Sequence, residues 1–273
     1  MADLSNLTGL AARMGEKAVE AGAIALDYFE HGGKTSASVS YKDGGSPVSA
    51  ADIAVDDYLR AQLCPLAPDA GWLSEESTDD PARLGKDDVL VVDPIDGTRA
   101  FINGDKRWGV AIALVRNGRP VAAALYMPAL QELYLAARGS GATCNGIALR
   151  ASGKQDLDGA TVGGPKKALD AMADRGMGII AEPRVPSLAY RLARVGSGAV
   201  DAGLASTNAW DWDIAAADLI IREAGGLLTG LDGEQPLYNQ PVPRHGILAA
   251  AGPALHPVLV AAVLAIQAKP AGS

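Results

Sequence analysis

A run of four apolar residues, 89–92, limits the fold of this chain more than any other segment. The run is short, rich in β-branched valine and bounded by charged residues and by Pro94, so it predicts a buried strand. Two carboxylates, Asp93 and Asp96, follow at the end of that strand. A chain of 273 residues that is 48% hydrophobic has enough apolar material to bury the strand in a core.

Two helices are predicted before this strand. Residues 4–29 are rich in Ala, Leu, Glu and Lys and end at a histidine followed by two glycines, which is a helix stop signal. A polar, glycine-rich loop at 42–47 follows, and Ser49 is predicted to cap the second helix. The apolar positions of that second helix are Ile53, Val55, Tyr58, Leu59 and Leu63.

Strands are predicted after the buried strand as well. Residues 109–115 and 120–127 are apolar runs joined at Asn117-Gly118, a strong hairpin signal, and a further strand is predicted over 131–136. Together these segments predict a half of the chain, residues 1–150, that combines a helix pair with an antiparallel sheet.

The second half, residues 151–273, has a different pattern. Short apolar runs alternate there with helix-like segments, and this alternation predicts an α/β half that packs closely against the first as a single unit. The apolar runs are 160–162, 178–181, 227–229 and 247–250, and the helix-like segments are 166–175, 187–196 and 214–223.

The acidic composition excludes one class of partner. The chain has 24 Lys and Arg against 32 Asp and Glu, a formal net charge of −8 and a pI of about 4.9. A nucleic-acid polymer is therefore not an expected partner. A small phosphorylated metabolite would need a local anion site, made by metal ions, helix N-termini or a few placed cations.

Cysteine use and the two ends of the chain predict a soluble, cytoplasmic protein. Cys64 and Cys144 lie far apart and outside any C-x-x-C pattern, so reduced thiols are expected. Residues 1–27 contain no continuous apolar stretch, so neither a signal peptide nor a membrane span is predicted. The apolar tail at 258–266 is too short to cross a bilayer and predicts a terminal helix, closed off by residues 269–272.

The acids after the buried strand suggest a metal and phosphate site. Asp93 and Asp96 stand three residues apart, with Pro94 stiffening the turn between them. Divalent cations such as Mg²⁺ prefer carboxylate and carbonyl oxygens. Phosphate binds N–H groups at a helix start, here Gly97 and Thr98. The alternative is an ordinary exit from a strand into a turn, since Asp, Pro and Gly are common in turns.

Two further acidic clusters favour the metal interpretation. Glu75 and Glu76 follow an apolar segment, and Asp211 and Asp213 precede an Ala-rich helix. Each cluster also has a structural explanation, because acids in the first turn of a helix interact favourably with its dipole and Asp is a good N-cap.

Other catalytic chemistries have little support. The three histidines, His31, His245 and His256, are widely separated in sequence, which argues against a zinc site. The sequence contains no G-x-S-x-G elbow, no P-loop lysine motif and no G-x-G-x-x-G fingerprint.

Four motifs follow one another along the chain. They are Lys42…Ser46-Pro47-Val48-Ser49-Ala50-Ala51-Asp52, then Glu75-Glu76-Ser77, then Asp93-Pro94-Ile95-Asp96-Gly97-Thr98, then Trp212-Asp213-Ile214-Ala215-Ala216 followed by Glu223-Ala224-Gly225-Gly226. Their order resembles that of the inositol monophosphatase superfamily of Mg²⁺-dependent, lithium-sensitive phosphatases. The resemblance covers about residues 40–230, and four motifs in the same order are highly specific. The fold it implies is a layered αβαβα sandwich, usually dimeric.

The resemblance implies two or three Mg²⁺ ions. Glu75, Asp93 and the carbonyl of Ile95 would hold one ion, and Asp93, Asp96 and Asp213 would hold a second. A third, weaker ion would lie near Glu75, and Li⁺ would inhibit by replacing one Mg²⁺. The ions would lower the pKa of a water that attacks phosphorus in line with the leaving group, without a covalent phosphoenzyme.

The resemblance also assigns roles to protein groups around the phosphate. Thr98, hydrogen-bonded to Asp52, would orient or deprotonate the water, and Glu75 completes the catalytic set. The substrate-binding residues would be Gly97, Thr98, Lys42, Arg99 and Asp211, although Asp211 could instead be an N-cap.

The sequence leaves the substrate open. Inositol-directed members of the superfamily carry Thr-Asn-Phe after the Gly-Thr pair, whereas this chain has Arg99 there, which is more similar to branches that act on nucleotide 3′-phosphates or histidinol phosphate. A glutamate that contacts the inositol ring in those members has no counterpart within 204–208. Inositol monophosphate is the default substrate, with a 3′(2′),5′-bisphosphate nucleotide and then histidinol phosphate as alternatives, and a fructose-1,6-bisphosphatase-like activity ranks low.

Five cationic residues and two tryptophans are further candidates for the substrate pocket. For each of the cationic residues a solvated surface position is favoured, and for each of the tryptophans packing in the core is favoured. The candidates are Arg99, Lys106, Arg107, Arg184, Arg191, Trp108 and Trp210.

A non-catalytic protein that binds a phosphorylated metabolite or an anionic lipid head group is the alternative from another functional class. The intact set of Asp52, Glu75, Asp93, Asp96, Thr98 and Asp213 argues against it, because its carboxylates would repel one another unless cations occupied the site.

Overall fold

The computed structural model describes residues 6–42 and 45–268. Asn6 caps the first helix, with its side chain accepting the N–H of Gly9, and Ser49 occupies the N-cap position of the second. The helices are α1 (Leu7–Leu26), α2 (Ala50–Leu63), α3 (Thr98–Ile102), α4 (Lys166–Asp174), α5 (Leu188–Gly196), α6 (Asp211–Glu223) and α7 (His256–Gln267), with 3₁₀ turns at Cys64–Leu66 and Pro81–Gly85.

The strands form two main sheets and two short pairs. The seven-stranded sheet has the order β3-β4-β5-β6-β7-β8-β9, the five-stranded sheet the order β11-β10-β12-β16-β14, and the pairs are β1-β2 and β13-β15. The strands are β1 (Val39–Tyr41), β2 (Pro47–Ser49), β3 (Gly71–Ser74), β4 (Asp88–Asp96), β5 (Gly109–Arg116), β6 (Arg119–Met127), β7 (Glu132–Ala137), β8 (Ala142–Cys144), β9 (Ile147–Ala148), β10 (Thr161–Gly163), β11 (Ile180–Ala181), β12 (Ala202–Ala205), β13 (Ala209–Trp210), β14 (Leu227–Gly230), β15 (Arg244–His245) and β16 (Leu248–Ala251).

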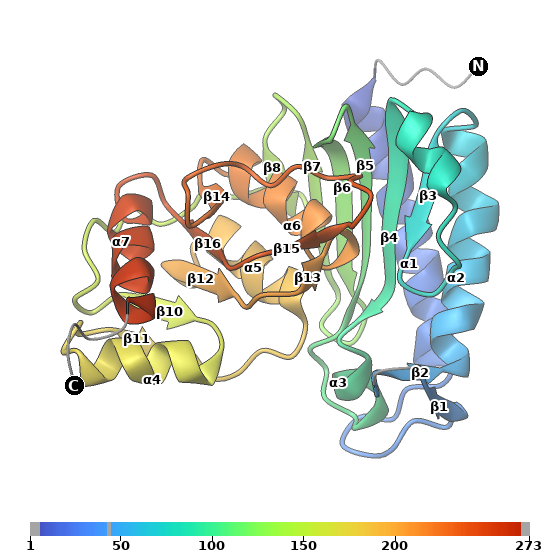
Figure 1. The fold of residues 1–273 in the computed structure, drawn as a ribbon. Helices are drawn as coiled ribbons and strands as arrows, with labels where there is room; N and C mark the ends of the chain where they lie inside the picture. The colour runs from blue at the N-terminus through green and yellow to red at the C-terminus, as the bar shows by residue number, and fades with distance from the viewer. Residues whose placement is uncertain (1–5, 43–44, 269–273) are drawn as a thin grey trace.

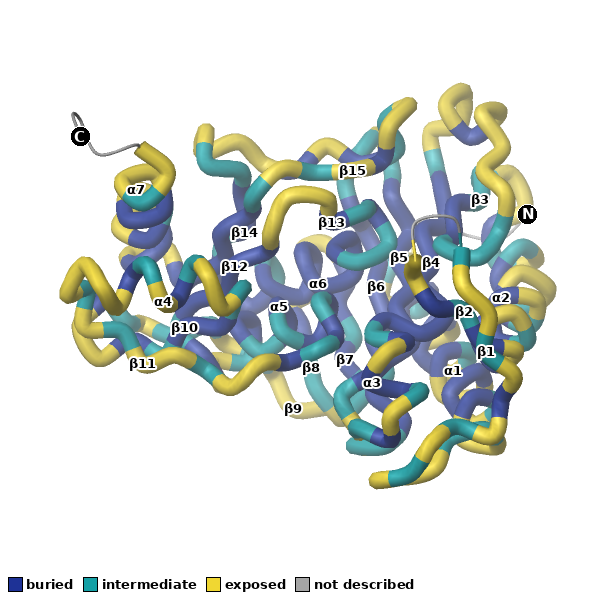
Figure 2. The backbone as a smooth tube through the Cα atoms, turned by 60° about the horizontal axis from the view of Figure 1, so that its bottom comes forward, coloured by how far each residue is buried: buried dark blue, intermediate teal, exposed yellow. Residues whose placement is uncertain are grey.

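The elements stack in alternating layers of helices and sheets (Figure 1). Helices α1 and α2 cover one face of the seven-stranded sheet, and α5 and α6 lie between that sheet and the five-stranded one. Helices α4 and α7 cover the outer face of the five-stranded sheet. This is the expected αβαβα sandwich, with the sheets and central helices buried and most exposed backbone in the outer helices and loops (Figure 2).

Strand β4 shows how the sequence produces these layers. Its side chains alternate between the two faces of the sheet, so Leu90 and Val92 pack toward α1 and α2, while Val89 and Val91 pack toward α5 and α6. All four are 0–1% exposed, which is why the run is apolar without a polar alternation.

The end of β4 is irregular, and this irregularity positions the acids. The pairing with β5 shifts register between Asp93 and Asp96, so the strand carries a bulge at Pro94. Gly97 then adopts a φ of 96° and caps α3. The starts of α5 and α6 approach this bulge from the central layer, and both contribute to the site described below.

Most of the predicted elements are confirmed. The buried strand, the hairpin and the alternating segments after residue 150 all form within a few residues of the predicted limits. The hairpin turn has positive φ at Asn117 (50°) and Gly118 (72°), as a two-residue turn that matches the strand twist requires. The division into 1–150 and 151–273 stays a prediction. Helix α6 packs against strands of both sheets, so the two parts share a helix layer.

Some details differ from the prediction. The first-half sheet is mixed rather than antiparallel, because β3 pairs parallel with β4. Ile53 lies on the outer side of α2 and is 44% exposed. The predicted helix over 4–29 spans Leu7–Leu26, and its predicted residues 4 and 5 lie outside the described residues, as do 43–44 of the loop and 269–272 of the tail. None of the helices in 6–42 and 45–268 is long and apolar enough to span a membrane.

Candidate active site

Three carboxylates meet at the bulged end of β4. Asp93, Asp96 and Asp213 each offer an oxygen within 4.8 Å of the others. Asp93 and Asp96 come from the strand, and Asp213 comes from the first turn of α6, where it also accepts the N–H of Trp210 (2.6 Å). The fold thus brings together acids that are 120 residues apart along the chain, the difference between positions 93 and 213.

Burial and mutual repulsion disfavour the charged form of Asp93 and Asp213. Burial raises the pKa of Asp93 well above its usual range, and the charges of Glu75, Asp96, Asp213 and Asp52 raise it further. Burial and the Asp96 charge do the same to the pKa of Asp213. A cluster of oxygen donors that repel one another in a buried position is chemically suited to a hard divalent cation such as Mg²⁺.

Asp96 is held by the start of α5. The N–H groups of Leu188 (3.0 Å) and Ala189 (2.7 Å) and the hydroxyl of Ser187 all donate to its carboxylate. Burial nevertheless raises the pKa of Asp96 to about 6 against the effect of these hydrogen bonds. Ser187 is not among the residues predicted for the site, because its only local signal in the sequence is its position before a helix.

Asp52 and Thr98 lie next to the metal candidates. The Thr98 hydroxyl is 3.3 Å from Asp52 Oδ1 and 3.2 Å from the carbonyl oxygen of Ile95. Asp52 Oδ2 accepts the N–H (2.8 Å) and the hydroxyl (2.6 Å) of Ser49, the residue that precedes α2. Burial raises the pKa of Asp52 to about 6, and repulsion by Glu75 contributes in the same direction.

Glu75 faces the cluster from the end of β3 but is not among the three acids that converge within 4.8 Å. Lys42 Nζ lies 3.1 Å from Glu75 Oε1 and 2.8 Å from Glu76 Oε2. Burial lowers the pKa of Lys42, but the two glutamates outweigh that effect and raise it. Burial raises the pKa of Glu76 to about 7, and its Oε1 has no partner among the described residues.

The other predicted substrate residues are placed differently. Arg99 is exposed on α3, and its Nη2 donates to the carbonyl of Gly45 (3.2 Å). Asp211 is fully buried, with Oδ1 2.7 Å from His245 Nε2 and Oδ2 accepting the N–H of Asn239 (2.7 Å). Both of its oxygens therefore have protein partners, and its contact with a substrate stays a prediction.

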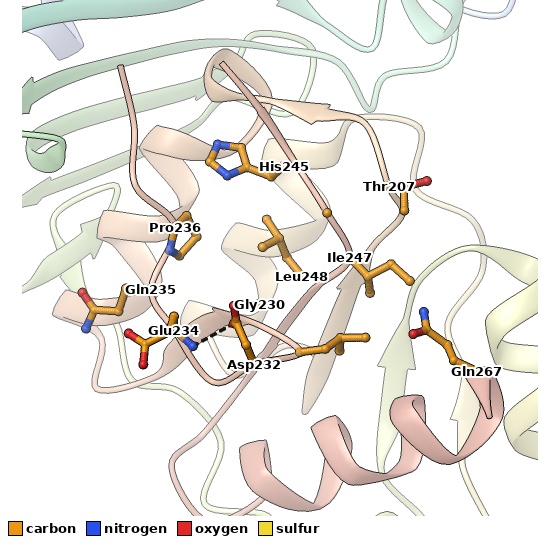
Figure 3. Close-up of a pocket in the computed structure, with 12 residues that line it drawn as sticks. Thr207, Gly230, Asp232, Glu234, Gln235, Pro236, His245, Ile247, Leu248 and Gln267 are labelled. Atoms are coloured by element: carbon orange, nitrogen blue, oxygen red, sulfur yellow. Dashed lines mark hydrogen bonds between the residues drawn. The ribbon is translucent and has the colours of Figure 1, made fainter. Parts of the chain in front are cut away.

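His245 also lines a separate cavity of about 450 Å³ with Thr207, Ile247 and Gln235 (Figure 3). The lining of that cavity includes none of the three clustered aspartates. The Asp211–His245 pair therefore connects the start of α6 to β15, the strand that carries His245 on the wall of this cavity.

The two candidate tryptophans are packed differently. Trp108 is fully buried and packs edge-on against Phe101, with ring centroids 4.9 Å apart. Trp210 stacks on Trp212 with centroids 5.0 Å apart and an interplanar angle of 5°. Cys64 and Cys144 are both free.

The layered fold, with an acidic cluster at a strand end that could hold a divalent cation, is typical of a class of α/β enzymes. A sequence model described as the inositol monophosphatase family matches residues 6–268. The chain belongs to this family, and it is a phosphoric monoester hydrolase.

Individual relatives agree with this placement. An inositol-1-monophosphatase of Mesorhizobium japonicum is 37% identical over 218 residues, covering 74% of this chain and 78% of the relative. A histidinol-phosphatase of Chlorobaculum parvum is 33% identical over 239 residues, covering 82% and 86%. The crystal structure of the extragenic suppressor protein suhB from Bartonella henselae superposes with a TM-score of 0.81 at 27% identity, covering 96% of this chain and 100% of that one.

Proposed function

We propose that this chain hydrolyses a small phosphate monoester with two or three Mg²⁺ ions held at the end of β4. The observation that carries the proposal is the buried convergence of Asp93, Asp96 and Asp213 within 4.8 Å. Asp93, Asp96 and Asp213 would hold one ion, and Glu75, Asp93 and the Ile95 carbonyl another. Bound Mg²⁺ would polarise the phosphoryl oxygens and make a water more acidic.

The protein's own groups would then control the proton and the phosphate. Thr98 Oγ1, which donates toward Asp52, would orient the attacking water, and Asp52 Oδ1 would take up the proton. The N–H groups of Gly97 and Thr98 open α3, where intrahelical partners are lacking, and would receive phosphate oxygens.

Lys42 and Arg99 would complete the substrate side of the site. Lys42 is already partly buried beside Glu75 and Glu76, so its ammonium group can approach a phosphate bound at the cluster. Li⁺ would inhibit by replacing one Mg²⁺. A homodimer in the cytoplasm is the proposed state of the protein.

The substrate itself has three candidates. Inositol 1-phosphate is favoured by the family and by the relative from Mesorhizobium japonicum. Histidinol phosphate is favoured by the Chlorobaculum parvum relative. Arg99 favours a 3′(2′),5′-bisphosphate nucleotide or histidinol phosphate, and the lack of an acid at 204–208 argues against recognition of the hydroxyl groups of a polyol such as inositol.

Phosphate release by the purified protein tests the proposal. We expect Mg²⁺-dependent release from at least one of inositol 1-phosphate, histidinol phosphate and adenosine 3′,5′-bisphosphate, and loss of release in EDTA. Asp93→Asn should reduce turnover to the EDTA level, because it removes a ligand assigned to both ions, while Asp57→Asn, on the exposed side of α2, serves as the matched control. Near-normal turnover by Asp93→Asn would contradict the two-metal proposal, and no release from any substrate would favour a binding protein.

A further inference from the structure

Arg191 is a cation next to the site that the proposed reaction does not use. It lies in α5, and its N–H donates to the carbonyl of Ser187 (3.2 Å), so it is one turn from the group that holds Asp96. A solvated surface position is expected for this residue from the sequence, but in the structure it is only partly exposed.

One hydrogen-bond donor of the Arg191 guanidinium lacks a partner among the described residues. This donor is Nε, which is buried. Burial lowers the pKa of Arg191. Attraction by Asp96 and Asp213 opposes this decrease, whereas repulsion by Arg184 adds to it. An arginine stays protonated at neutral pH, so a positive charge is kept in a position where part of its hydration is lost.

A cavity of about 560 Å³ opens beside Arg191, between the start of α4 and the start of α5. Arg184 also lines it, on the exposed side. The two acids of the cavity already have partners: Glu182 pairs with Arg194 (2.5 Å) and Asp170 with Lys166 (2.6 Å). The charges of Arg184 and Arg191 are therefore not neutralised by the acids that line the cavity.

Cation binding at the cluster would increase this charge imbalance. If Asp96 and Asp213 held divalent ions, their negative charge would no longer compensate the positive charge of Arg191. A guanidinium that is partly buried and lacks a carboxylate partner is suited to an external anion, which its planar donors can bind in a bidentate manner.

We propose that this cavity binds a second anionic group of the substrate, a phosphate or carboxylate on the leaving group, and that Arg191, assisted by Arg184, selects phosphate monoesters that carry one. The inference depends on the proposed function, because the scissile phosphate must lie at the acidic cluster. It narrows the substrate class from phosphate monoesters in general to those with two anionic groups.

Two matched pairs of substrates test this selection. 3-Phosphoglycerate and glycerol 3-phosphate differ by a carboxylate, and adenosine 3′,5′-bisphosphate and adenosine 3′-phosphate differ by a second phosphate. We expect kcat/KM to favour the doubly anionic member at least about tenfold, which corresponds to about 1.4 kcal/mol, in whichever pair matches the cavity. Arg191→Met should remove this preference, and Arg191→Lys should keep part of it.

Lys167→Met is the matched control, because Lys167 is an exposed cation on α4 that does not line this cavity. It should leave the preference unchanged. A preference that survives Arg191→Met, or that is absent from both pairs in the unmodified protein, would overturn the inference and leave the proposed function intact.

A binding measurement separates the inference from the reaction. In calorimetry with Mg²⁺, 3-phosphonopropionate should bind at least about tenfold more tightly than propylphosphonate, and Arg191→Met should equalise the two. Equal binding to the unmodified protein would contradict a second anion site. If no ester releases phosphate, the proposed function fails, and this measurement still decides whether the cavity binds an anion.

Discussion

At the residue scale, Asp52 is the group whose protonation should set the lower pH limit of activity. Its pKa is raised to about 6, chiefly by burial, and bound cations would lower that value. We therefore expect kcat/KM to decrease as the pH falls below about 6, because a protonated Asp52 cannot accept the proton of the water.

The pH profiles of two variants check this assignment. Asp52→Asn should lose the acid limb and about 10²–10⁴-fold in rate. Thr98→Val should also be strongly impaired, while Thr98→Ser, which keeps the hydroxyl 3.3 Å from Asp52, should retain most activity. An acid limb that persists unchanged in Asp52→Asn would assign it to another group.

The sequence predicted the residues of local motifs better than those brought in by the fold. Asp93 and Asp96 could be identified as a candidate ligand pair because they stand together at the end of an apolar strand. Ser187 could not, since it meets Asp96 only across 91 residues of chain. Arg191 was expected at the surface because a lone arginine carries no signal that a helix start and a cavity will enclose it.

At the element scale, the turn from β4 into α3 depends on Gly97. Its φ of 96° disfavours other residues, and an added Cβ would lie 3.3 Å from the carbonyl oxygen of Arg107 and 3.4 Å from Ser187 Cα. We expect Gly97→Ala to destabilise the fold by about 1–3 kcal/mol and to reduce turnover, because the turn also positions Asp96 and Thr98.

Gly139→Ala is the control for the cost of placing a non-glycine residue at a positive φ. Gly139 has a φ of 76° but nothing within 4 Å of an added Cβ. It should cost only the backbone preference, about 1–2 kcal/mol, and leave turnover intact. Thermal unfolding and phosphate release compare the two variants, and equal effects on both properties would show that the tight contacts of Gly97 are unimportant.

The elements that the sequence missed share a physical reason. Strands β13 and β15 have two residues each, too few to show a periodic pattern. The parallel pairing of β3 with β4 was not predicted because the intervening segment contains only a 3₁₀ turn rather than a crossover helix. The hairpin at Asn117-Gly118, by contrast, is specified by two adjacent residues and was predicted correctly.

At the scale of the whole molecule, the acidic site should make the stability of the metal-free protein depend on pH. The pKa values of Asp52 and Asp96 are raised to about 6 and that of Glu76 to about 7. Carboxylates with raised pKa values contribute stability that is present at low pH and is lost as the pH rises through these values. The melting temperature in EDTA should therefore fall between pH 5 and 7.5.

Mg²⁺ should largely restore the melting temperature at pH 7.5 and have little effect at pH 5, because protons compete for the same oxygens. The difference between Mg²⁺ and EDTA is the informative quantity. His256 has a pKa lowered by burial and contributes a pH dependence of opposite sign, but it does so in both conditions. A difference that does not grow with pH would contradict the assignment of the cluster as a cation site.

The layer order is also a property of the whole molecule, and the sequence predicted it only through the family resemblance. Local patterns predicted that the second half alternates between strands and helices. They did not show that α6 would pack against strands of both sheets, since that arrangement depends on contacts between segments remote in sequence. The candidate site combines the motif residues Asp93 and Asp96 on β4 with Asp213 on α6, which the packing of the layers brings within 4.8 Å of them.

The most direct test of the central claim is the position of bound metal. Crystals grown with Mn²⁺ in place of Mg²⁺, measured with anomalous scattering, should show a peak among the carboxylates of Asp93, Asp96 and Asp213, and a second peak toward Glu75 and the Ile95 carbonyl. The peaks should be absent from Asp93→Asn crystals. A well-ordered structure with saturating Mn²⁺ and no peak at the end of β4 would contradict a cation site formed by these carboxylates.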